Sequence, residues 1–424
     1  MADVQPLRAL RYDPQVVGPL ENVVAPPYDV IDASQRAQLL ARSPFNVVAV
    51  DLPQAEPGST SEQDPYVAAG ETFAGWQRVG ALVRDERPAL WAHTQDYTGP
   101  DGSSRTRRGF FCRVRIEDYG PGRVRPHERT HPGPKEDRLR LTRATRANIS
   151  PIFSLYSDPQ QAAWRALAPA TEERPWAQIG DADGTVHQLW RVADPAAIAA
   201  VQDAARTSEL LIADGHHRYE TMHAYAEELG GEGEHRYILM CLVALEDPGL
   251  TVFPTHRLIG GLDEERLGAL EQALRRDFDV EEVPEREVAP PPGGGPLQLG
   301  FFAASDERSL RLTLKDQAIA DAALADRSEA YRRLDTGVLE TLLLKNALGY
   351  SDEDIAHFNG MFYARDTAEA LSMVRSGTYQ AAFLMRPTPV EQVREVAAEG
   401  ENMPPKSTYF FPKLLTGLLF NPLS

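Results

Sequence analysis

The stretch Glu209-Leu-Leu-Ile-Ala-Asp-Gly-His-His-Arg-Tyr-Glu220 passes from an apolar run through a tight turn into a helical pattern. The apolar run predicts a buried strand, and Asp214-Gly215 predicts the turn. A helix that starts here presents backbone N–H groups and its positive dipole end to an anion. Arg218 adds a planar donor that fits phosphate or carboxylate. The segment therefore predicts an anion-binding or nucleotide-binding turn, although Asp214 also suits a plain helix cap.

The residues of this turn are the first candidates for a functional site. Gly215 lacks a Cβ that would keep a ligand away from the backbone. His216 and His217 supply donors for a transferring oxygen, because phosphoryl transfer depends mainly on positioning and charge stabilisation. We expect the two histidines to be catalytic. The residues expected to bind the nucleotide are Asp214, Gly215, His216, His217 and Arg218.

The composition is that of a globular protein with an acidic charge balance. The chain has 424 residues, of which 42% are hydrophobic and 25% charged, and its formal net charge is −18. This length predicts two or three domains, and the acidic balance argues against general binding to nucleic acid or to anionic membranes. Cys112 and Cys241 are too few for a disulfide framework. Without an apolar run that could span a bilayer or a signal peptide at its start, the chain is expected in the cytoplasm.

Strand and helix patterns are mixed along the chain and predict an α+β (mixed α/β) fold. The expected regions are 1–120, 121–260 and 261–424. Strands are expected at 88–94, 108–116, 151–156, 186–192, 237–245, 297–302, 310–314 and 379–385. Helices are expected at 66–79, after Gly215 and at 389–399, and a charged loop is expected before residue 151.

A basic island lies within this acidic chain between Arg123 and Arg146. It holds seven arginines and Lys135. Arginines that face one pocket would concentrate an anionic substrate there, whereas a solvated loop with local ion pairs is the alternative. The candidate substrate-binding residues in the island are His127, Arg129 and Arg138.

The same island contains His127-Glu-Arg-Thr-His131, which matches the zinc-binding string of metalloproteases. That chemistry needs a helix across the string, and Pro126 with Pro132-Gly-Pro134 disfavours one. No protein ligand of a metal is therefore assigned. Glu128 stands among arginines, which favour its anionic form. It could serve as a general base, contact a metal ion or form a structural ion pair.

Two further loops carry polar candidates. Lys406-Ser407 suits a polyphosphate, but the upstream G-x-x-x-x-G of a P-loop is absent. Its alternative role is a polar cap over the aromatic run 409–411. Tyr28-Asp29 follows a Pro-Pro pair and either lines a substrate cleft or turns the chain.

Four motifs, taken in this order, resemble the DUF1015 family of bacterial and archaeal proteins. They are Ala25-Pro-Pro-Tyr-Asp-Val-Ile31, His127-Glu-Arg-Thr130, Ala213-Asp-Gly-His-His-Arg-Tyr-Glu-Thr221 and Met403-Pro-Pro-Lys-Ser-Thr-Tyr-Phe-Phe-Pro-Lys413. The chain is identified as a member of that family over almost its whole length. The family name assigns no function.

Residues 121–260 are also similar to the ParB/sulfiredoxin superfamily, which includes ParB nucleotidases, sulfiredoxin and free-serine kinases. Gly215-His-His-Arg218 is similar to the turn that holds nucleotide phosphates there. The resemblance implies a ParB/sulfiredoxin-like core in which Glu128 matches the catalytic carboxylate of the serine kinases. His216 stands where sulfiredoxin has its reactive cysteine, so sulfinic acid reduction is not expected. The acidic balance disfavours a DNA-partition role.

These features predict a nucleotide-dependent phosphotransferase that acts on a small hydroxylated metabolite. The resemblance implies free L-serine as the acceptor. The donor would be ATP, ADP or CTP with Mg²⁺. A phosphate-ester hydrolase or NTPase, or a nucleotide sensor without catalysis, are the alternatives. The expected partners are a small-molecule donor and acceptor, and the oligomeric state stays open.

Overall fold

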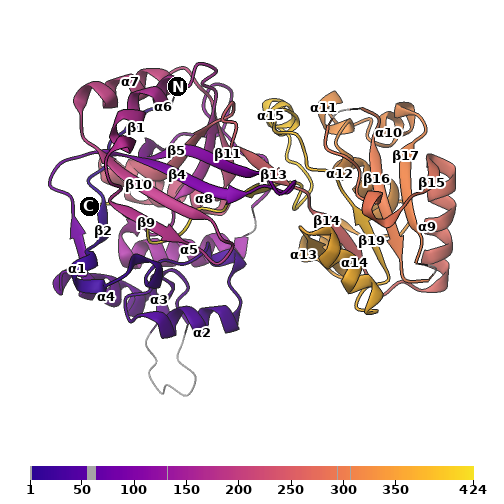
Figure 1. Cartoon of the computed structure of the whole chain (residues 1–424), viewed down its shortest axis with the longest axis horizontal. Helices are drawn as coiled ribbons and strands as arrows, with labels where there is room; N and C mark the ends of the chain where they lie inside the picture. The colour runs from indigo at the N-terminus through magenta and orange to yellow at the C-terminus, as the bar shows by residue number, and fades with distance from the viewer. Residues whose placement is uncertain (1, 55–63, 131, 294, 306) are drawn as a thin grey trace. The chain divides into compact units, whose positions relative to one another are not determined.

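The computed structural model describes residues 2–54, 64–130, 132–293, 295–305 and 307–424 (Figure 1). Contacts within the chain divide it into two compact units. Unit 1 comprises residues 1–126, 130–251 and 412–424, and unit 2 comprises residues 127–129 and 252–411. Each unit combines helices and strands, so the fold is mixed α/β, as the sequence predicts.

Unit 1 is built on a sheet with nine strands among the described residues. They are β1 (Val4–Gln5), β4 (Leu90–Thr98), β5 (Ser104–Arg115), β6 (Val124–Arg125), β8 (Ile152–Tyr156), β9 (Ala177–Gly180), β10 (Val186–Val192), β11 (Leu210–Asp214) and β12 (Tyr237–Ala244). Their order is β6-β11-β8-β12-β5-β4-β10-β9, with β1 on β5. β11 is parallel to β6 and β12 to β8, whereas the other pairs are antiparallel. The border expected near residue 120 therefore falls inside one sheet.

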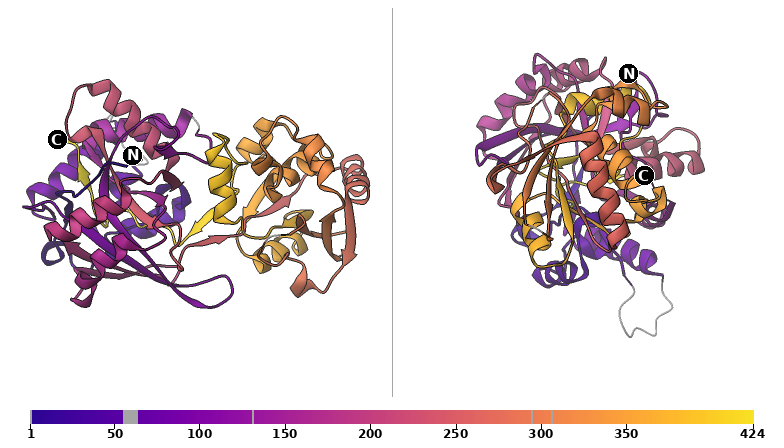
Figure 2. Two further views of the ribbon diagram at one scale, coloured as in Figure 1. Left: turned by 90° about the horizontal axis from the view of Figure 1, so that it is seen from above. Right: turned by 90° about the vertical axis from the view of Figure 1, so that its right-hand side faces the viewer.

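Both faces of this sheet are buried, and they differ in chemistry. On one face, α6 (Ala162–Leu167), α7 (Pro195–Ala205) and α8 (His216–Leu229) pack on an apolar core that includes Phe110 and Met240 (Figures 1 and 2). Alternate residues of a strand point to opposite faces. The other face therefore carries the buried polar side chains of His93, Gln95 and Arg107.

Helix α8 begins where the sequence predicts. Gly215 turns the chain with a φ of 102°, a conformation that residues with a Cβ rarely adopt. Tyr219, Met222 and Ala226 are buried, in agreement with their helical spacing. Leu229 continues that spacing in the sequence but is 53% exposed, because the helix ends there.

The basic segment after residue 131 is a helix and not the expected loop. Helix α5 (Pro132–Thr145) packs beside α4 (Pro65–Arg78) and α8. Prolines are tolerated in its first turn, where backbone N–H groups have no partner within the helix. Lys135 pairs with Glu220 and Arg143 pairs with Glu228 on α8, so acidic partners offset part of the positive charge.

Short elements complete unit 1. They are α1 (Pro14–Val17), α2 (Ala33–Arg42), α3 (Val48–Asp51), η1 (Leu20–Asn22), η2 (Tyr28–Val30), η3 (Ala168–Glu172), η4 (Glu234–Arg236), and the paired strands β2 (Leu10–Tyr12) with β3 (Leu82–Arg84) and β7 (Ala147–Asn148) with β21 (Asn421–Pro422). The pairing of β21 returns the last residues of the chain to unit 1, where Leu414, Leu418 and Phe420 are buried.

Unit 2 has its own antiparallel sheet, in the order β15-β17-β16-β19-β14-β18. Its strands are β14 (His256–Ile259), β15 (Phe278–Glu282), β16 (Gln298–Ala303), β17 (Ser309–Leu314), β18 (Met361–Ala364) and β19 (Ala381–Leu384), and a separate pair is β13 (Thr251–Phe253) with β20 (Tyr409–Phe411). Its helices are α9 (Glu264–Asp277), η5 (Glu285–Glu287), α10 (Gln317–Ala323), α11 (Glu329–Arg332), α12 (Asp335–Val338), the π-helix η6 (Leu339–Lys345), α13 (Asp352–His357), α14 (Thr367–Arg375) and α15 (Val390–Ala398). Leu258, Phe302 and Leu384 lie in its core.

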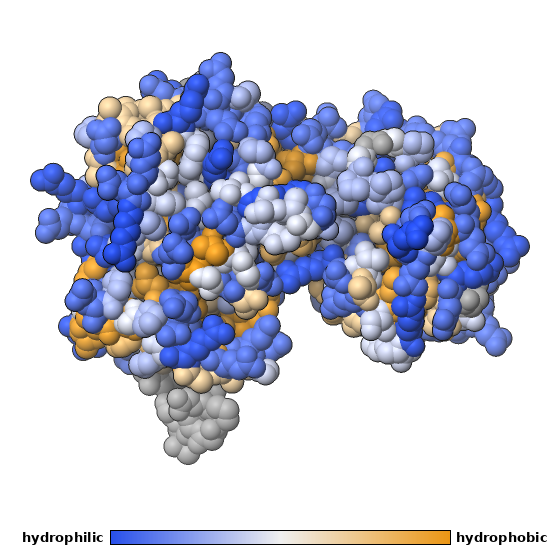
Figure 3. All heavy atoms as spheres, in the orientation of Figure 1, coloured by the Kyte–Doolittle hydropathy of each residue, from blue (hydrophilic) through white to orange (hydrophobic). Residues whose placement is uncertain are grey.

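The surface is largely hydrophilic on the face that Figure 3 presents, with smaller apolar areas between the charged residues. This distribution agrees with the 25% of charged residues in the sequence. Among the described helices, none combines the length and the apolar composition that crossing a bilayer requires.

Candidate functional site

The turn between β11 and α8 holds a carboxylate between two cations. Asp214 ends β11, and its Oδ2 lies 2.5 Å from Nη2 of Arg218. Its Oδ1 lies 2.6 Å from Nζ of Lys413, which comes from the last segment of the chain. Burial alone would raise the pKa of Asp214, but Lys413 and Arg218 outweigh it and hold the pKa well below its usual range. Asp214 is therefore ionised, and the three groups together carry one surplus positive charge.

The first turn of α8 gives this cluster its geometry. The side chain of Arg218 folds back along the helix start toward Asp214, and its Nη1 donates to the carbonyl of Pro151. A Cβ on Gly215 would lie 3.0 Å from Nε of Arg218, so the glycine leaves room for the guanidinium. His216 is buried and His217 is half-buried at the same helix start. The structure thus brings the predicted nucleotide-binding residues of this motif to one place.

Arg107 on β5 adds a third cation, which is fully buried and contacts the residue before Lys413. Its side chain is 1% exposed, and its guanidinium lies 4.3 Å from the centre of the Phe153 ring. Burial lowers the pKa of Arg107 to about 10, and the charge of Asp214 is among the influences that raise it. Within the part of the chain that the structure describes, Nη1 of Arg107 has no hydrogen-bond partner. A buried cation of this kind favours an anion nearby.

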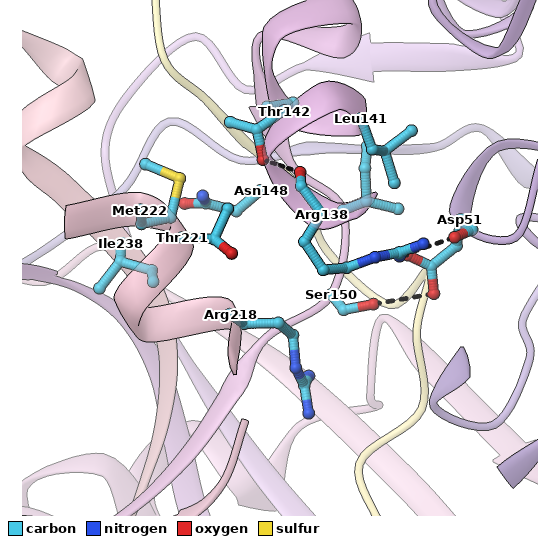
Figure 4. A pocket seen from close by; sticks show the side chains of 12 residues that line it. Asp51, Arg138, Leu141, Thr142, Asn148, Ser150, Arg218, Thr221, Met222 and Ile238 are labelled. Carbon is cyan, nitrogen blue, oxygen red and sulfur yellow. Dashed lines mark hydrogen bonds and ion pairs between the residues drawn. The ribbon is translucent and has the colours of Figure 1, made fainter. Parts of the chain in front are cut away.

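A small cavity of about 40 Å³ adjoins Arg218 on the side of α5 (Figure 4). Its lining combines polar side chains, among them Asp51, Arg138 and Ser150, with the apolar side chains of Leu141, Met222 and Ile238. A water molecule needs about 10–15 Å³ measured in this way, so the cavity has room for roughly three. It is too small for a nucleotide in this conformation.

Asp51 lines this cavity together with Arg138 and Ser150. Its carboxylate accepts from Nη1 of Arg138 at 3.0 Å and from Oγ of Ser150 at 3.1 Å. Burial raises the pKa of Asp51, although Arg138 and Arg218 act in the opposite direction. Asp51 therefore combines a raised pKa with a place beside Arg218.

Arg138 and Tyr28, two predicted substrate-binding residues, lie in direct contact. The Arg138 guanidinium lies 4.1 Å from the centre of the Tyr28 ring, and it also pairs with Asp51 and Asp137. Burial raises the pKa of Tyr28 to about 12, while Arg218 and Arg138 lower it. Arg138 is thus engaged by residues of its own unit, and Asp29 is exposed next to Tyr28. Their contact with a substrate stays a prediction.

In unit 2, the segment 127–129 meets the C-terminal motif. The carbonyl of His127 accepts from the Met403 amide at 2.8 Å, and its Nε2 lies 2.9 Å from Oγ1 of Thr408. Glu128 is half-buried and Arg129 is exposed. Residues 127–130 are not helical, in agreement with the argument from the prolines, and His131 lies outside the described residues.

The Lys406-Ser407 loop belongs to the same part of unit 2. Lys406 is exposed and has a φ of 54°. Ser407 is buried, and its hydroxyl donates to the carbonyl of Pro404 at 2.7 Å and lies 3.0 Å from Oγ1 of Thr336. These bonds hold the loop in shape, and the predicted contacts of Lys406 and Ser407 with a nucleotide stay a prediction.

Comparison with known proteins identifies the family. The family model described as "Protein of unknown function (DUF1015)" matches residues 4–337. The chain belongs to the DUF1015 family. A search of curated proteins gave no match. In this DUF1015 protein the motif 403–413 lies beyond the matched range, yet Lys413 at its end pairs with Asp214 of the motif 213–221.

The DUF1015 chain is also similar to several solved structures. A conserved hypothetical protein from Pyrococcus furiosus is 15% identical, with a TM-score of 0.34, over 68% of this chain and 87% of the other. A free serine kinase in complex with AMP is 15% identical, with a TM-score of 0.36, over 68% and 83%. SbnI with a C-terminal truncation, from Staphylococcus aureus, is 11% identical, with a TM-score of 0.36, over 69% and 82%.

Three residues at the turn were not among the predicted site residues. Lys413 is the last residue of the motif 403–413, so its membership of that motif could have marked it as a candidate site residue. Arg107 and Gln95 lie on strands in the middle of unit 1, and an arginine and a glutamine in strands give no local signal of a site. Their importance follows from contacts with the segment around Lys413, which is distant in sequence.

Proposed function

We propose that this protein is a nucleotide-dependent phosphotransferase whose donor phosphates bind at the Asp214–Arg218 turn. The observation that carries the proposal is the Lys413–Asp214–Arg218 cluster at the start of α8. Its surplus positive charge and the positive dipole end of helix α8 both favour a polyanion. Buried charge is costly unless an anion balances it, so a bound phosphate would complete the cluster.

The chemistry expected at this turn is mainly electrostatic. In the reaction, the bond between the terminal phosphorus and the nucleotide oxygen breaks, and a bond to the acceptor oxygen forms. Lys413 and Arg218 would hold the phosphate oxygens as negative charge moves to the leaving group. His216 or His217 would donate a hydrogen bond to a transferring oxygen. Glu128 is proposed to accept the proton of the acceptor hydroxyl, a role that rests on the sequence resemblance.

Mg²⁺ would enter with the nucleotide. Among the described residues, no group of three or more His, Cys, Asp or Glu side chains could hold a metal ion alone. Mg²⁺ commonly binds substrate phosphates and keeps several waters, so the nucleotide itself would supply its main ligands, because both oxygens of Asp214 already pair with cations. The ion would neutralise part of the phosphate charge.

A ³¹P NMR time course tests the proposal. Purified protein is mixed with Mg²⁺, L-serine and ATP, ADP or CTP in turn, and a new phosphomonoester signal is expected with one donor. Glu128→Gln should reduce turnover by about 10²–10⁴-fold if Glu128 is the general base. Arg143→Gln, which removes an exposed ion pair with Glu228, is the matched control and should keep full turnover.

Each other outcome has a distinct meaning. Inorganic phosphate without a phosphomonoester would indicate the hydrolase or NTPase. Nucleotide binding without turnover would indicate a sensor. A Glu128→Gln protein with full turnover would remove Glu128 from the reaction. Absence of both binding and turnover with all three nucleotides would contradict the proposed function.

A further inference from the structure

The backbone around Lys413 forms hydrogen bonds with side chains of the sheet, and it is not itself part of a strand. Strand β20 ends at Phe411, and residues 412–415 belong to no helix or strand. Nη2 of Arg107 on β5 donates to the carbonyl of Pro412 at 2.5 Å. Nε2 of Gln95 on β4 donates to the carbonyl of Lys413 at 3.0 Å. Two successive carbonyls are thus bound to neighbouring strands of the sheet.

Gln95 connects these two bonds. Its Oε1 accepts hydrogen bonds from Nε of Arg107 at 3.0 Å and from Nη2 of the same guanidinium. Its Nε2 donates to the carbonyl of Lys413. Only a side chain with an acceptor and a donor at its tip can do both. The contacts with Arg107 therefore fix which way the Gln95 amide faces. Gln95 is 1% exposed, so water does not replace these bonds.

The choice of glutamine at position 95 is informative. A glutamate there would neutralise the buried Arg107. A buried charge without an ionic partner costs free energy in a protein interior. Glutamate could not donate to the carbonyl of Lys413, and its negative charge would repel that oxygen. With glutamine at position 95, Arg107 has no ion pair with this residue, but the hydrogen bond from Gln95 to the carbonyl of Lys413 is kept.

We propose that Gln95 and Arg107 are positioning residues that set the Nζ of Lys413 against Asp214. Any effect of these residues on phosphate binding rests on the proposed function. Their effect on the position of Lys413 rests on the hydrogen-bond geometry alone. With the carbonyls of Pro412 and Lys413 fixed, Lys413 needs to order only its side chain to reach Asp214. Without these two bonds, the backbone of Pro412 and Lys413 would lose its hydrogen bonds to β4 and β5.

The substitution Gln95→Glu tests this role without removing Arg107's partner. Lys413 is labelled with an amine-acylating reagent in the full-length protein without any ligand, and its modified fraction is followed by mass spectrometry. Loss of one buried hydrogen bond corresponds to a change of about 2- to 10-fold in an equilibrium, so labelling of Lys413 should rise by about that factor. Thermal stability should stay at or above that of the wild type.

A matched control lies on the same sheet. Gln188 on β10 bonds to Gln178 and Thr94, is partly exposed and has no contact with the 412–415 segment among the described residues. Gln188→Glu should leave Lys413 labelling unchanged. If Gln95→Glu does not fold, Arg107→Lys provides the second variant, because lysine keeps the charge but cannot bind Gln95 and the Pro412 carbonyl in the same way. It should also raise the labelling of Lys413.

The outcomes separate this proposal from the proposed function. Raised labelling in Gln95→Glu, together with weaker binding of Mg²⁺–ADP, supports both. Raised labelling in a protein that binds no nucleotide supports the positioning role and contradicts the phosphate site. Labelling of Lys413 equal to that of the wild type in the folded variants overturns the positioning role, whatever the nucleotide does.

Discussion

Asp214 is the residue on which the proposed site depends most directly. It is a carboxylate at a helix start, where it could have served only as a cap, yet its two oxygens pair with Arg218 and Lys413. Both partners in each of these contacts are charged, and charge-assisted hydrogen bonds are roughly twice as strong as neutral ones. The same carboxylate therefore contributes to folding and keeps in place the two cations that we propose to bind phosphate.

Substituting Asp214 by Asn should destabilise the protein in a pH-dependent way. At pH 7 the loss should be about 2 kcal/mol, because two partly buried cations lose a charged hydrogen-bond partner. The pKa of Asp214 is lower in the folded chain than the ordinary value near 4, so its stabilisation is complete above about pH 4. As the pH falls below that value, the unfolded chain binds the proton more readily than the folded chain, so the stabilisation is lost progressively down to the pKa of the folded carboxyl.

Urea unfolding of the wild type and of Asp214→Asn at pH 7 and at pH 3 measures this difference. The gap in the free energy of unfolding should be smaller at pH 3. Equal free energies of unfolding at pH 7 would show that the two ion pairs contribute nothing to stability.

At the scale of the element, α8 has two ends with left-handed glycines in different surroundings. Gly215 at its start has a φ of 102°, and an added Cβ would meet the guanidinium of Arg218. Gly230 at its end has a φ of 65°, and an added Cβ would meet nothing within 4 Å. A side chain at Gly230 would therefore add backbone strain alone, whereas a side chain at Gly215 would add strain and also displace Arg218.

Substituting each glycine by alanine separates the two effects. Both variants should lose about 1 kcal/mol of stability, because alanine is strained at positive φ. Only Gly215→Ala should also weaken the binding of Mg²⁺–ADP, by about tenfold, since Arg218 would shift from Asp214. Calorimetric titration of both variants tests this, and equal affinities would show that Arg218 does not contact the phosphates.

The whole molecule is divided into units that do not follow the order of the sequence. Residues 412–424 return to unit 1 after the chain has formed unit 2. They add a row of buried apolar side chains, which are Leu414, Leu415, Leu418, Leu419, Phe420 and Leu423. Unit 1 therefore depends on a segment that is far away in sequence from most of its strands.

Removal of residues 412–424 should unfold unit 1. Each of these side chains contributes about 1.5–3 kcal/mol on burial, so their sum is comparable to the whole stability of a domain, about 5–15 kcal/mol. Near-ultraviolet circular dichroism should lose the signal of buried Trp91. The prediction fails if the shortened protein unfolds cooperatively at the urea concentration of the full-length chain.

Local patterns were sufficient for most elements. The expected strands correspond to β4, β5, β8, β10, β11 and β12 in unit 1 and to β16, β17 and β19 in unit 2, and the expected helices correspond to α4, α8 and α15. They follow from apolar spacing and turn residues, because hydrophobic periodicity is a local property. Helix α5 was expected to be a loop because of its basic composition. Its charges are balanced by acidic residues on α8, a pairing that no local pattern contains.

The sequence by itself determined the family, the mixed fold and the strand–turn–helix at Asp214–Arg218, because each depends on residues that are close together in the chain. The tertiary structure decided that Lys413 pairs with Asp214 and that Gln95 and Arg107 hold the backbone beside it. It also decided that the last residues belong to unit 1. These contacts join residues separated by 199 to 318 positions, and only the packing of the folded chain brings such residues within hydrogen-bonding distance.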